Sequence, residues 1–422
     1  MWINTLWNNV WDDARKKIIL FDTTLRDGHQ CPGAAVEKDN DYFDIVRWLD
    51  GIGFDICEVW FPASSKHEAW RVKEVASMCQ SGEISTMVCG LTQMVDFQVE
   101  ACLHSLEPAA IVDKGFFHIY FPVDPVLREA SIGNKISNEE ALSNVAKFTK
   151  MAKDSNMRIQ FSPEWYSRVG DNFDFCTELL IAAAENGATY FNMPDTIGWE
   201  DSDNKEKEYY VSSILKHKKI LDKSFPDNNF VWSVHNHNDL GNAVQNSING
   251  VKKRTGIYKI EWTINGVWER AGNADILQII TRMKTTLADQ FDIDHIEASK
   301  ILSVSQLVSK LMLPVQPNYP IVWDNAMKHT AGGHANAILK NPEVYQPFTP
   351  TLVGWEISLV YGPNSGGNLA INILKENWYD CRNINKRGLD GFLKKKMQET
   401  GRYKGITDEE LLELYIEYQW TQ

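Results

Sequence analysis

Short apolar runs alternate with longer amphipathic stretches from about residue 17 to residue 290 of the chain. The runs have the length of strands, and the stretches between them repeat apolar positions at helical spacing. Two helical stretches, DYFDIVRWLDGIG and FDFCTELLIAAAENG, end in glycine, which is a common helix stop. The predicted strands cover residues 17–21, 55–59, 85–89, 115–120, 158–161, 190–193, 231–234 and 259–263.

Eight strand-then-helix units favour a TIM (β/α)₈ barrel, and an open doubly wound sheet, which usually has fewer strands, is the alternative. Residues with polar or ionisable side chains lie just past nearly every predicted strand, and this distribution favours the barrel. In a barrel these ends converge on one mouth, whereas the outer strands of an open sheet are too far apart to share a site. The residues at these positions are Asp22, Arg26, Asp27, Glu58, Gly90, His118, Ser162, Glu164, Asn192, Asp195, Thr196, His235, His237 and Asn265.

After about residue 290 the sequence pattern changes and predicts helices and loops rich in glycine and proline. The predicted domains are therefore an amphipathic N-terminal helix over residues 1–16, the catalytic barrel over 17–290, and mostly helical C-terminal subdomains over 291–422. No internal repeat or low-complexity tract interrupts this order.

Composition narrows the class of protein without deciding its function. The net charge of -13 argues against a nucleic-acid partner, although local basic side chains could still hold phosphates. No apolar run reaches the roughly 18 residues needed to span a membrane. The seven cysteines are odd in number and widely spaced, which is typical of reduced thiols in a cytoplasmic protein.

The motif SVHNHNDLGNAV, residues 233–244, predicts a metal site. His235 and His237 are two residues apart at a strand end, so their side chains share a face and can take adjacent positions on a divalent ion. The alternative is a pair of hydrogen-bonded structural histidines in a loop.

The motif FDTTLRDGHQCPGA, residues 21–34, follows the first predicted strand and would complete that site. A carboxylate from Asp27 with two imidazoles suits one Mg²⁺, Mn²⁺ or Zn²⁺ ion, with positions left open for substrate. Arg26 would lie beside the metal as a fixed cation able to polarise a carbonyl or carboxylate oxygen. The alternative for Arg26 and Asp27 is a surface salt bridge.

DTTLRDG on the first strand together with HNHND on the seventh resembles a metal-dependent barrel superfamily. Its members include 2-isopropylmalate, homocitrate and citramalate synthases, HMG-CoA lyase and 4-hydroxy-2-oxovalerate aldolase. Further similar segments follow in order over residues 17 to 375: DICEVWFPASSKHEAWRVKEVA, VCGLTQ, FSPEW, NMPDTIGW, NGVWERAGNAD, HTAGGHANAILKNPEVY and GPNSGGNLA. The HTAGGH segment belongs to the synthases and not to the lyases, so the resemblance favours the synthase branch.

The resemblance implies an acyltransferase that condenses acetyl-CoA with a 2-oxo acid and hydrolyses the thioester, as 2-isopropylmalate synthase does in leucine biosynthesis. Homocitrate, (Re)-citrate and citramalate synthases, which use other 2-oxo acids, are the alternatives. A retro-condensing lyase of the HMG-CoA lyase or aldolase type is the second alternative, and a catalytically silent homologue the third. The leucine-sensing C-terminal domain of the longer synthases is not expected in this chain.

The resemblance also implies roles for individual residues. Asp27, His235 and His237 match the metal ligands, Arg26 matches the catalytic, substrate-binding arginine, and Glu164 matches a glutamate that pairs with a histidine base. The residues that match groups contacting or lining the 2-oxo acid pocket are His118, Asn192, Thr196 and Asn265. For each of these residues the alternative is a satisfied structural side chain.

The segment containing His329 and its neighbour His334 has a different place in the resembling family. There it enters the barrel of the partner subunit, where the counterpart of His329 supplies acid/base chemistry and His334 would contact substrate. A homodimer is therefore expected, with His329 donated in trans.

Several positions depart from the synthase pattern. His29 stands where the family has glutamate, Trp60 where it has glycine, and Trp268 where it has a small residue. HIYFPVDP replaces HTFIATS after the fourth strand, and GPNSGG replaces GKHSGR. The two tryptophans bring large side chains near the mouth, so 2-oxoisovalerate is the expected substrate while a smaller or more polar acid such as oxaloacetate stays open.

Overall fold

The computed structural model describes residues 15–132, 136–201, 209–252, 255–322 and 325–421. The chain divides into two compact units, Met1–Pro314 and Val315–Gln422.

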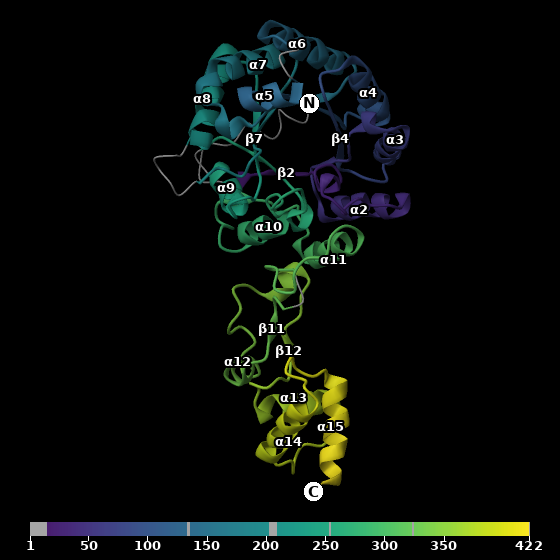
Figure 1. The fold of residues 1–422 in the computed structure, drawn as a ribbon, viewed down its shortest axis with the longest axis vertical. Coiled ribbons are helices and arrows are strands. Elements are labelled where there is room, and N and C mark those ends of the chain that lie inside the picture. Colours follow the sequence, from purple (N-terminus) through teal and green to yellow (C-terminus); the bar gives the residue numbers. More distant parts are fainter. Residues whose placement is uncertain (1–14, 133–135, 202–208, 253–254, 323–324, 422) are drawn as a thin grey trace. The chain divides into compact units, whose positions relative to one another are not determined.

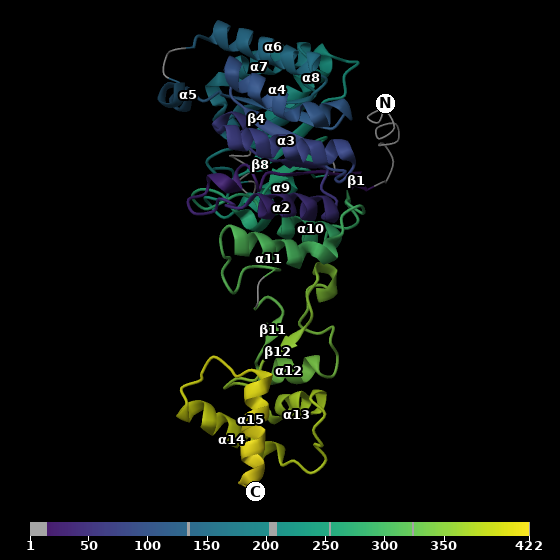
Figure 2. The same ribbon diagram turned by 90° about the vertical axis from the view of Figure 1, so that its right-hand side faces the viewer.

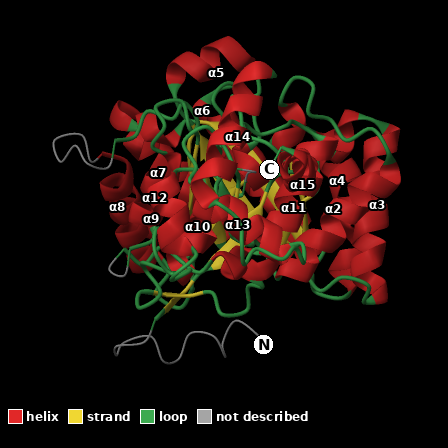
Figure 3. Cartoon of the chain, turned by 90° about the horizontal axis from the view of Figure 1, so that it is seen from below, coloured by secondary structure: helices red, strands yellow, loops and turns green. Residues whose placement is uncertain are grey.

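Eight parallel strands close the first unit into a barrel, which confirms the predicted TIM fold. Figures 1 and 3 show these strands inside a ring of helices. The ladder closes between the first and the last strand, where Ile19 pairs with Lys259. In chain order the strands are β2 (Ile19–Asp22), β3 (Ile56–Glu58), β4 (Met87–Thr92), β5 (Gly115–Pro122), β6 (Arg158–Glu164), β7 (Tyr190–Asp195), β8 (Val231–Asn236) and β9 (Lys259–Trp262).

The strands β4 to β8 run two or three residues further than the hydrophobic pattern predicts. Their last positions carry residues such as Glu164, Asp195 and Asn236, which end the apolar run but not the hydrogen-bonded ladder. These extra positions bring polar side chains to the mouth of the barrel on regular backbone, where their directions are fixed.

The helices of the first unit follow from ordinary start and stop signals. Ser65 and Ser137 cap α3 and α6 by accepting from a backbone N–H three residues on, and α2 ends at Gly53 with φ of 101°. The helices that cover the strands are α2 (Asp39–Ile52), α3 (Lys66–Ser81), α4 (Asp96–Ile111), α6 (Asn138–Asp154), α7 (Phe173–Glu185), α8 (Tyr209–Ser224), α9 (Ala243–Gly250) and α10 (Ile276–Lys284). The short helix α5 (Pro125–Ile132) follows β5 and buries none of its residues.

A layer of apolar side chains fills the start of the barrel interior. Phe21 lies against Phe116 with ring centroids 6.0 Å apart, and Phe116 lies 4.7 Å from Tyr190, so side chains from β2, β5 and β7 meet inside. This packing closes the bottom of the barrel, and a second, polar layer lies beyond it toward the mouth.

The first unit extends past residue 290, the predicted end of the barrel. β10 (Phe291–Asp292) pairs with β1 (Lys16–Lys17), and α11 (Ile301–Leu311) buries Ile301, Val304 and Val308 against the barrel. The apolar face of α11 needs this cover, so the unit continues to Pro314. The helix predicted over residues 1–16 falls on residues 1–14, outside the described part, and on Lys16, which lies in β1.

The second unit is mostly helical, as predicted. A short parallel pair, β11 (Lys328–His329) with β12 (Ser358–Leu359), is followed by α13 (Gly367–Glu376), α14 (Lys386–Glu399) and α15 (Asp408–Trp420), and α12 (Gly332–Ile338) lies between the two strands in sequence. Leucines from the last three helices form its core, and Figure 2 shows α15 beside α13 and α14. Among the described residues no helix is long and apolar enough to cross a bilayer.

Candidate active site

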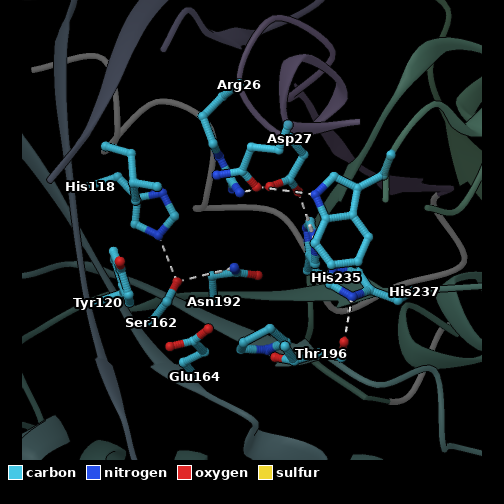
Figure 4. A pocket seen from close by; sticks show the side chains of 14 residues that line it. Arg26, Asp27, His118, Tyr120, Ser162, Glu164, Asn192, Thr196, His235 and His237 are labelled. Atoms are coloured by element: carbon cyan, nitrogen blue, oxygen red, sulfur yellow. Dashed lines mark hydrogen bonds and ion pairs between the residues drawn. The ribbon is translucent and has the colours of Figure 1, made fainter. Parts of the chain in front are cut away.

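A cavity of about 590 Å³, counting space open to solvent, lies at the carboxyl ends of the barrel strands (Figure 4). Most of the side chains around it are polar or charged. It is lined by Arg26, Asp27, Gln30, Leu91, His118, Tyr120, Ser162, Glu164, Asn192, Pro194, Thr196, His235, His237 and Trp268. Eight of the eleven predicted site residues therefore meet in one place; Asn265, His329 and His334 do not line it.

The three predicted metal ligands converge on one side of this cavity. Asp27 follows β2, His235 belongs to β8, and His237 comes directly after β8. Their ligand atoms all lie within 4.8 Å of one another, and all three side chains are buried. The Nε2 atoms of the two imidazoles are 2.9 Å apart, and the carboxylate Oδ2 of Asp27 lies 3.2 Å from His235 Nε2.

Neighbouring groups orient these ligands in a way that suits a cation. His237 donates Nδ1–H to the carbonyl oxygen of Thr196 at 2.6 Å, so its Nε2, which lies next to His235 Nε2, is the unprotonated nitrogen. Burial, the neighbouring His235 and nearby arginines hold the pKa of His237 well below its ordinary value. A metal-binding imidazole has to be neutral, and this environment keeps it neutral.

Asn273 lies beside Asp27. Its Nδ2 donates to Asp27 Oδ2 at 3.1 Å, and its buried Oδ1 has no hydrogen-bond partner among the described residues. A buried oxygen without a hydrogen-bond partner would be satisfied by a bound cation. The donor set present in the chain therefore fits a divalent metal.

Arg26 lies between two carboxylates at the cavity wall. Its guanidinium forms an ion pair with Asp27, and its Nε donates to Glu58 Oε2 at 2.5 Å. Burial alone would raise the pKa of Glu58, but the charges of Arg26 and His118 outweigh burial and lower it to about 2. Glu58 is thus a fixed anion that holds the arginine in place.

His118 and Asn192 are joined through Ser162. His118 Nδ1 lies 2.6 Å from Glu58 Oε1, and its Nε2 lies 2.7 Å from Ser162 Oγ. Ser162 also accepts from Asn192 Nδ2 at 3.1 Å. Glu58, His118, Ser162 and Asn192 thus form one hydrogen-bonded chain.

Glu164 ends β6 and faces the cavity (Figure 4). Within the described part of the chain its carboxylate has no hydrogen-bond partner. Burial raises the pKa of Glu164 to about 7, with Arg26 opposing the shift. A carboxyl group that titrates near neutral pH in a cavity is a typical acid/base candidate.

Thr196 lines the cavity, but Asn265 does not. Thr196 Oγ1 accepts from Trp165 N at 3.0 Å, which leaves its hydroxyl proton for a ligand. The side chain of Asn265 exchanges hydrogen bonds with Ser305 of α11, at 2.5 Å and 3.0 Å. The left-handed backbone of Asn265, with φ of 59°, turns the side chain away from the pocket predicted for it.

His329 and His334 lie in the second unit. His329 is half buried on β11, and burial followed by His334 lowers its pKa. His334 is exposed on α12 and stacks on Tyr345 with ring centroids 4.2 Å apart. Their rings are 6.4 Å apart, so the two histidines form one surface cluster.

The structure adds residues that were not predicted as site residues. Ser162 lines the cavity, whereas Glu58 and Asn273 do not line it but contact the lining residues Arg26 and Asp27. Ser162 and Glu58 stand in the strand-end pattern and Asn273 in the NGVWERAGNAD segment, but their partners come from other parts of the chain. Tyr120 and Trp268 also line the cavity.

Two departures from the family pattern lie outside the cavity. His29 is buried and accepts from the backbone N–H of Val36 at 3.3 Å, and burial lowers its pKa to about 4, so it is a neutral structural group. Trp60 packs against His29 and donates to Ser64, away from the cavity lining.

Comparison with known proteins places this site in a family. The HMGL-like family model matches residues 17–308, and the homocitrate synthase post-HMGL domain-like model matches residues 321–379. The chain belongs to the HMGL-like family. This confirms the resemblance seen in the sequence.

The similar curated relatives are on the synthase branch. The chain is 32% identical to a 2-isopropylmalate synthase of Methylacidiphilum infernorum over 94% of this chain and 74% of that one. It is 33% identical to that of Hydrogenovibrio crunogenus over 86% of this chain and 66% of that one. The chain thus spans about two thirds of the length of such relatives.

The solved hydroxymethylglutaryl-CoA lyase of Pseudomonas aeruginosa has the same fold, with a TM-score of 0.55. The match covers 72% of this chain and 96% of that one at 15% identity. This likeness concerns the fold alone.

Proposed function

We propose that this protein condenses acetyl-CoA with a 2-oxo acid and hydrolyses the resulting thioester, in the manner of a 2-isopropylmalate synthase. The observation that carries the proposal is the buried group of Asp27, His235 and His237 with Arg26 beside it, at the mouth of a barrel related to these synthases. The expected setting is leucine biosynthesis in the cytoplasm, in keeping with the seven free thiols of the chain.

Asp27, His235 and His237 would hold one divalent ion, Mg²⁺, Mn²⁺ or Zn²⁺, and Asn273 Oδ1 could join them. When bound, the ion would polarise the keto group of the 2-oxo acid and balance the charge that develops on its oxygen. The chain's own residues perform the remaining tasks.

Arg26 is placed to bind the oxo acid and to stabilise negative charge on it. Glu58 and Asp27 fix its guanidinium at the cavity wall, so little reorganisation is needed when charge develops. The hydroxyl of Thr196 and the amide of Asn192 offer hydrogen bonds to the carboxylate and keto oxygens. His118 lines the same wall, where it is held by Glu58 and Ser162.

The difficult step is removal of a proton from the methyl group of acetyl-CoA, which is a very weak acid. We assign this to His329, donated by the second subunit of a homodimer, with Glu164 fixing its tautomer and stabilising its charged form. The pKa of His329 is lowered, so a neutral imidazole is available as base. His334 would contact the substrate from the same segment.

The reaction then balances in two steps. The methyl carbon bonds to the keto carbon, whose oxygen takes up a proton. Water next cleaves the thioester, giving a carboxylate and the free thiol of CoA. This irreversible hydrolysis drives the condensation forward.

The decisive assay supplies acetyl-CoA with 2-oxoisovalerate, pyruvate, oxaloacetate or 2-oxoglutarate and follows free CoA with a thiol reagent. Oxo-acid-dependent CoA release at a rate above that of Arg26→Ala supports the proposal. A lyase would instead cleave 3-hydroxy-3-methylglutaryl-CoA without releasing free CoA. If the metal-loaded protein releases no CoA with any of the four acids, the proposed activity is wrong.

A further inference from the structure

The loop after β9 places a tryptophan directly against one of the metal-ligand candidates. The indole of Trp268 lines the cavity and lies on the ring of His237, with centroids 3.8 Å apart and planes inclined by 43°. Trp268 is nearly buried, with 9% of its surface exposed to solvent. Any group that binds beside His237 therefore has this indole as a neighbour.

Three contacts hold the indole in this position. Besides the ring of His237, its Nε1 donates to Gln30 Oε1 at 3.2 Å, and the guanidinium of Arg270 lies 4.5 Å from the ring centroid. Arg270 is itself held by Asp239 at 2.9 Å. An aromatic ring fixed on several sides acts as a rigid wall, because each alternative rotamer would lose these contacts.

The rest of the wall offers little apolar surface to an oxo-acid substituent. Apart from the indole, the only described lining residues with wholly apolar side chains are Leu91 and Pro194. In Figure 4, Tyr120, Ser162 and Glu164 lie across the cavity from His237 and present polar groups. The indole is the largest side chain of the lining and lies against His237, so its removal would open the most room beside the metal-ligand candidates.

We propose that Trp268 is a specificity-determining residue that limits the 2-oxo acid to those with a short substituent. This inference rests on the proposed function, because it concerns the acceptor of that reaction. It assigns acids no larger than 2-oxoisovalerate to the site in preference to acids with a four-carbon branched substituent. One methylene more or less in a fitted pocket changes selectivity by about 10-fold to 200-fold, so an indole is ample for this role.

The test compares Trp268→Ala with the wild-type chain and uses binding as its main readout. Calorimetry on the Mn²⁺-loaded protein gives the Kd of pyruvate and of 4-methyl-2-oxopentanoate. The wild-type chain is expected to prefer pyruvate, and the variant to shift the ratio of the two Kd values by about 10-fold or more toward the larger acid. Trp70→Ala on α3, a half-exposed indole outside the cavity lining, is the matched control and should leave the ratio unchanged.

Trp268→Phe guards against a folding failure, since it keeps a ring on His237 and loses only the bond to Gln30 and part of the volume. It should shift the ratio in the same direction by less. An unchanged ratio in both folded variants, or no acid bound by any of the proteins, would overturn the role of Trp268. CoA release measured on the same samples reports on the proposed activity separately, because acids can bind with altered size preference even where no CoA is released.

Discussion

The first unit supplies the candidate metal ligands, and the second supplies the histidine proposed as the base. These two halves of the proposed chemistry, the metal half and the acid/base half, differ in how firmly their surroundings hold the side chains. In the barrel, Asp27, His235 and His237 are buried, and each contacts partners supplied by other strands or loops. In the second unit, His329 and His334 lie on a two-residue strand and a short helix, and their nearest described partners are each other, Tyr345 and Gln346.

The difference shows what a fold can preorganise by itself. Side chains at the ends of barrel strands are fixed by regular backbone and by a low-dielectric surrounding that strengthens each polar contact. A half-exposed histidine on a short connection has neither support, so in the proposed dimer we expect its chemistry to depend on the surface of the partner. The metal half should therefore respond to single substitutions within the barrel, and the acid/base half to subunit association.

The largest effect is expected at the metal half. His237→Ala removes one of three converging ligands, so most of the bound metal should be lost. The kcat should fall by about 10³-fold or more, because a bound metal contributes several kcal/mol of transition-state stabilisation. Elemental analysis after gel filtration measures the metal content. His104→Ala, an exposed histidine on α4, is the control. If folded His237→Ala keeps its full metal content, the assignment of the metal site is wrong.

The next largest effect concerns Glu164, the carboxyl group proposed to pair with His329. Glu164→Gln cannot stabilise a charged histidine, so kcat should fall by about 10²-fold while KM changes less. Burial raises the pKa of Glu164 to about 7, and the ionised form is the active one. The kcat of the wild-type protein should therefore rise as pH increases through about 7, and this rise should vanish in the variant.

A pH profile of kcat with acetyl-CoA at saturation measures this dependence, together with hydrogen exchange of the acetyl methyl group. Glu107→Gln on α4 is an exposed control. His329→Ala should lower both readouts by a similar factor, since the two groups act as a pair. Near wild-type kcat in Glu164→Gln and His329→Ala would show that another group is the base.

Subunit mixing tests whether the second unit acts on a different copy of the barrel. Arg26→Ala and His329→Ala are each expected to be nearly inactive. If His329 acts in trans, random exchange makes half of the dimers mixed, and one of the two sites in each is intact. Activity should then recover to about a quarter of the wild-type level, a gain of tens of fold. No recovery in verified mixed dimers would place His329 in its own subunit's site or outside catalysis.

The same contrast explains how far the sequence could predict the molecule. All eight barrel strands follow from apolar runs, because parallel strands covered on both faces carry such runs locally. The metal group was predictable because His235 and His237 are neighbours in sequence and Asp27 lies in a recognisable motif.

What the sequence could not supply is the direction of side chains set by distant contacts. Asn265 stands at a strand end as predicted, but a left-handed residue conformation points it at Ser305. Asn273 reaches Asp27 across 246 positions of the chain, and no local pattern announces such a contact. The boundary near residue 290 differs for the same reason, since the packing of α11 on the barrel is a tertiary contact.

The smallest expected effect lies beneath the metal half, at Glu261 of β9. Its Oε2 lies 3.5 Å from Nδ1 of His235, and its other oxygen pairs with Lys259, with both side chains fully buried. Carboxylates behind a ligating histidine hold its tautomer and usually contribute 10-fold to 100-fold in metal affinity. The contact is long, so Glu261→Gln should weaken metal binding by about 10-fold.

Glu261→Gln alone also leaves Lys259 without its counter-charge in the barrel interior, which should lower Tm. The double variant Lys259→Met with Glu261→Gln removes the buried pair together and should recover most of the Tm. If Glu261 orients His235, the metal Kd of the double variant stays about 10-fold above that of the wild type despite the recovered stability. If calorimetry shows instead that the metal Kd of the double variant returns to the wild-type value together with the Tm, Glu261 is a purely structural partner of Lys259. Metal binding in the barrel would then depend on the ligands alone.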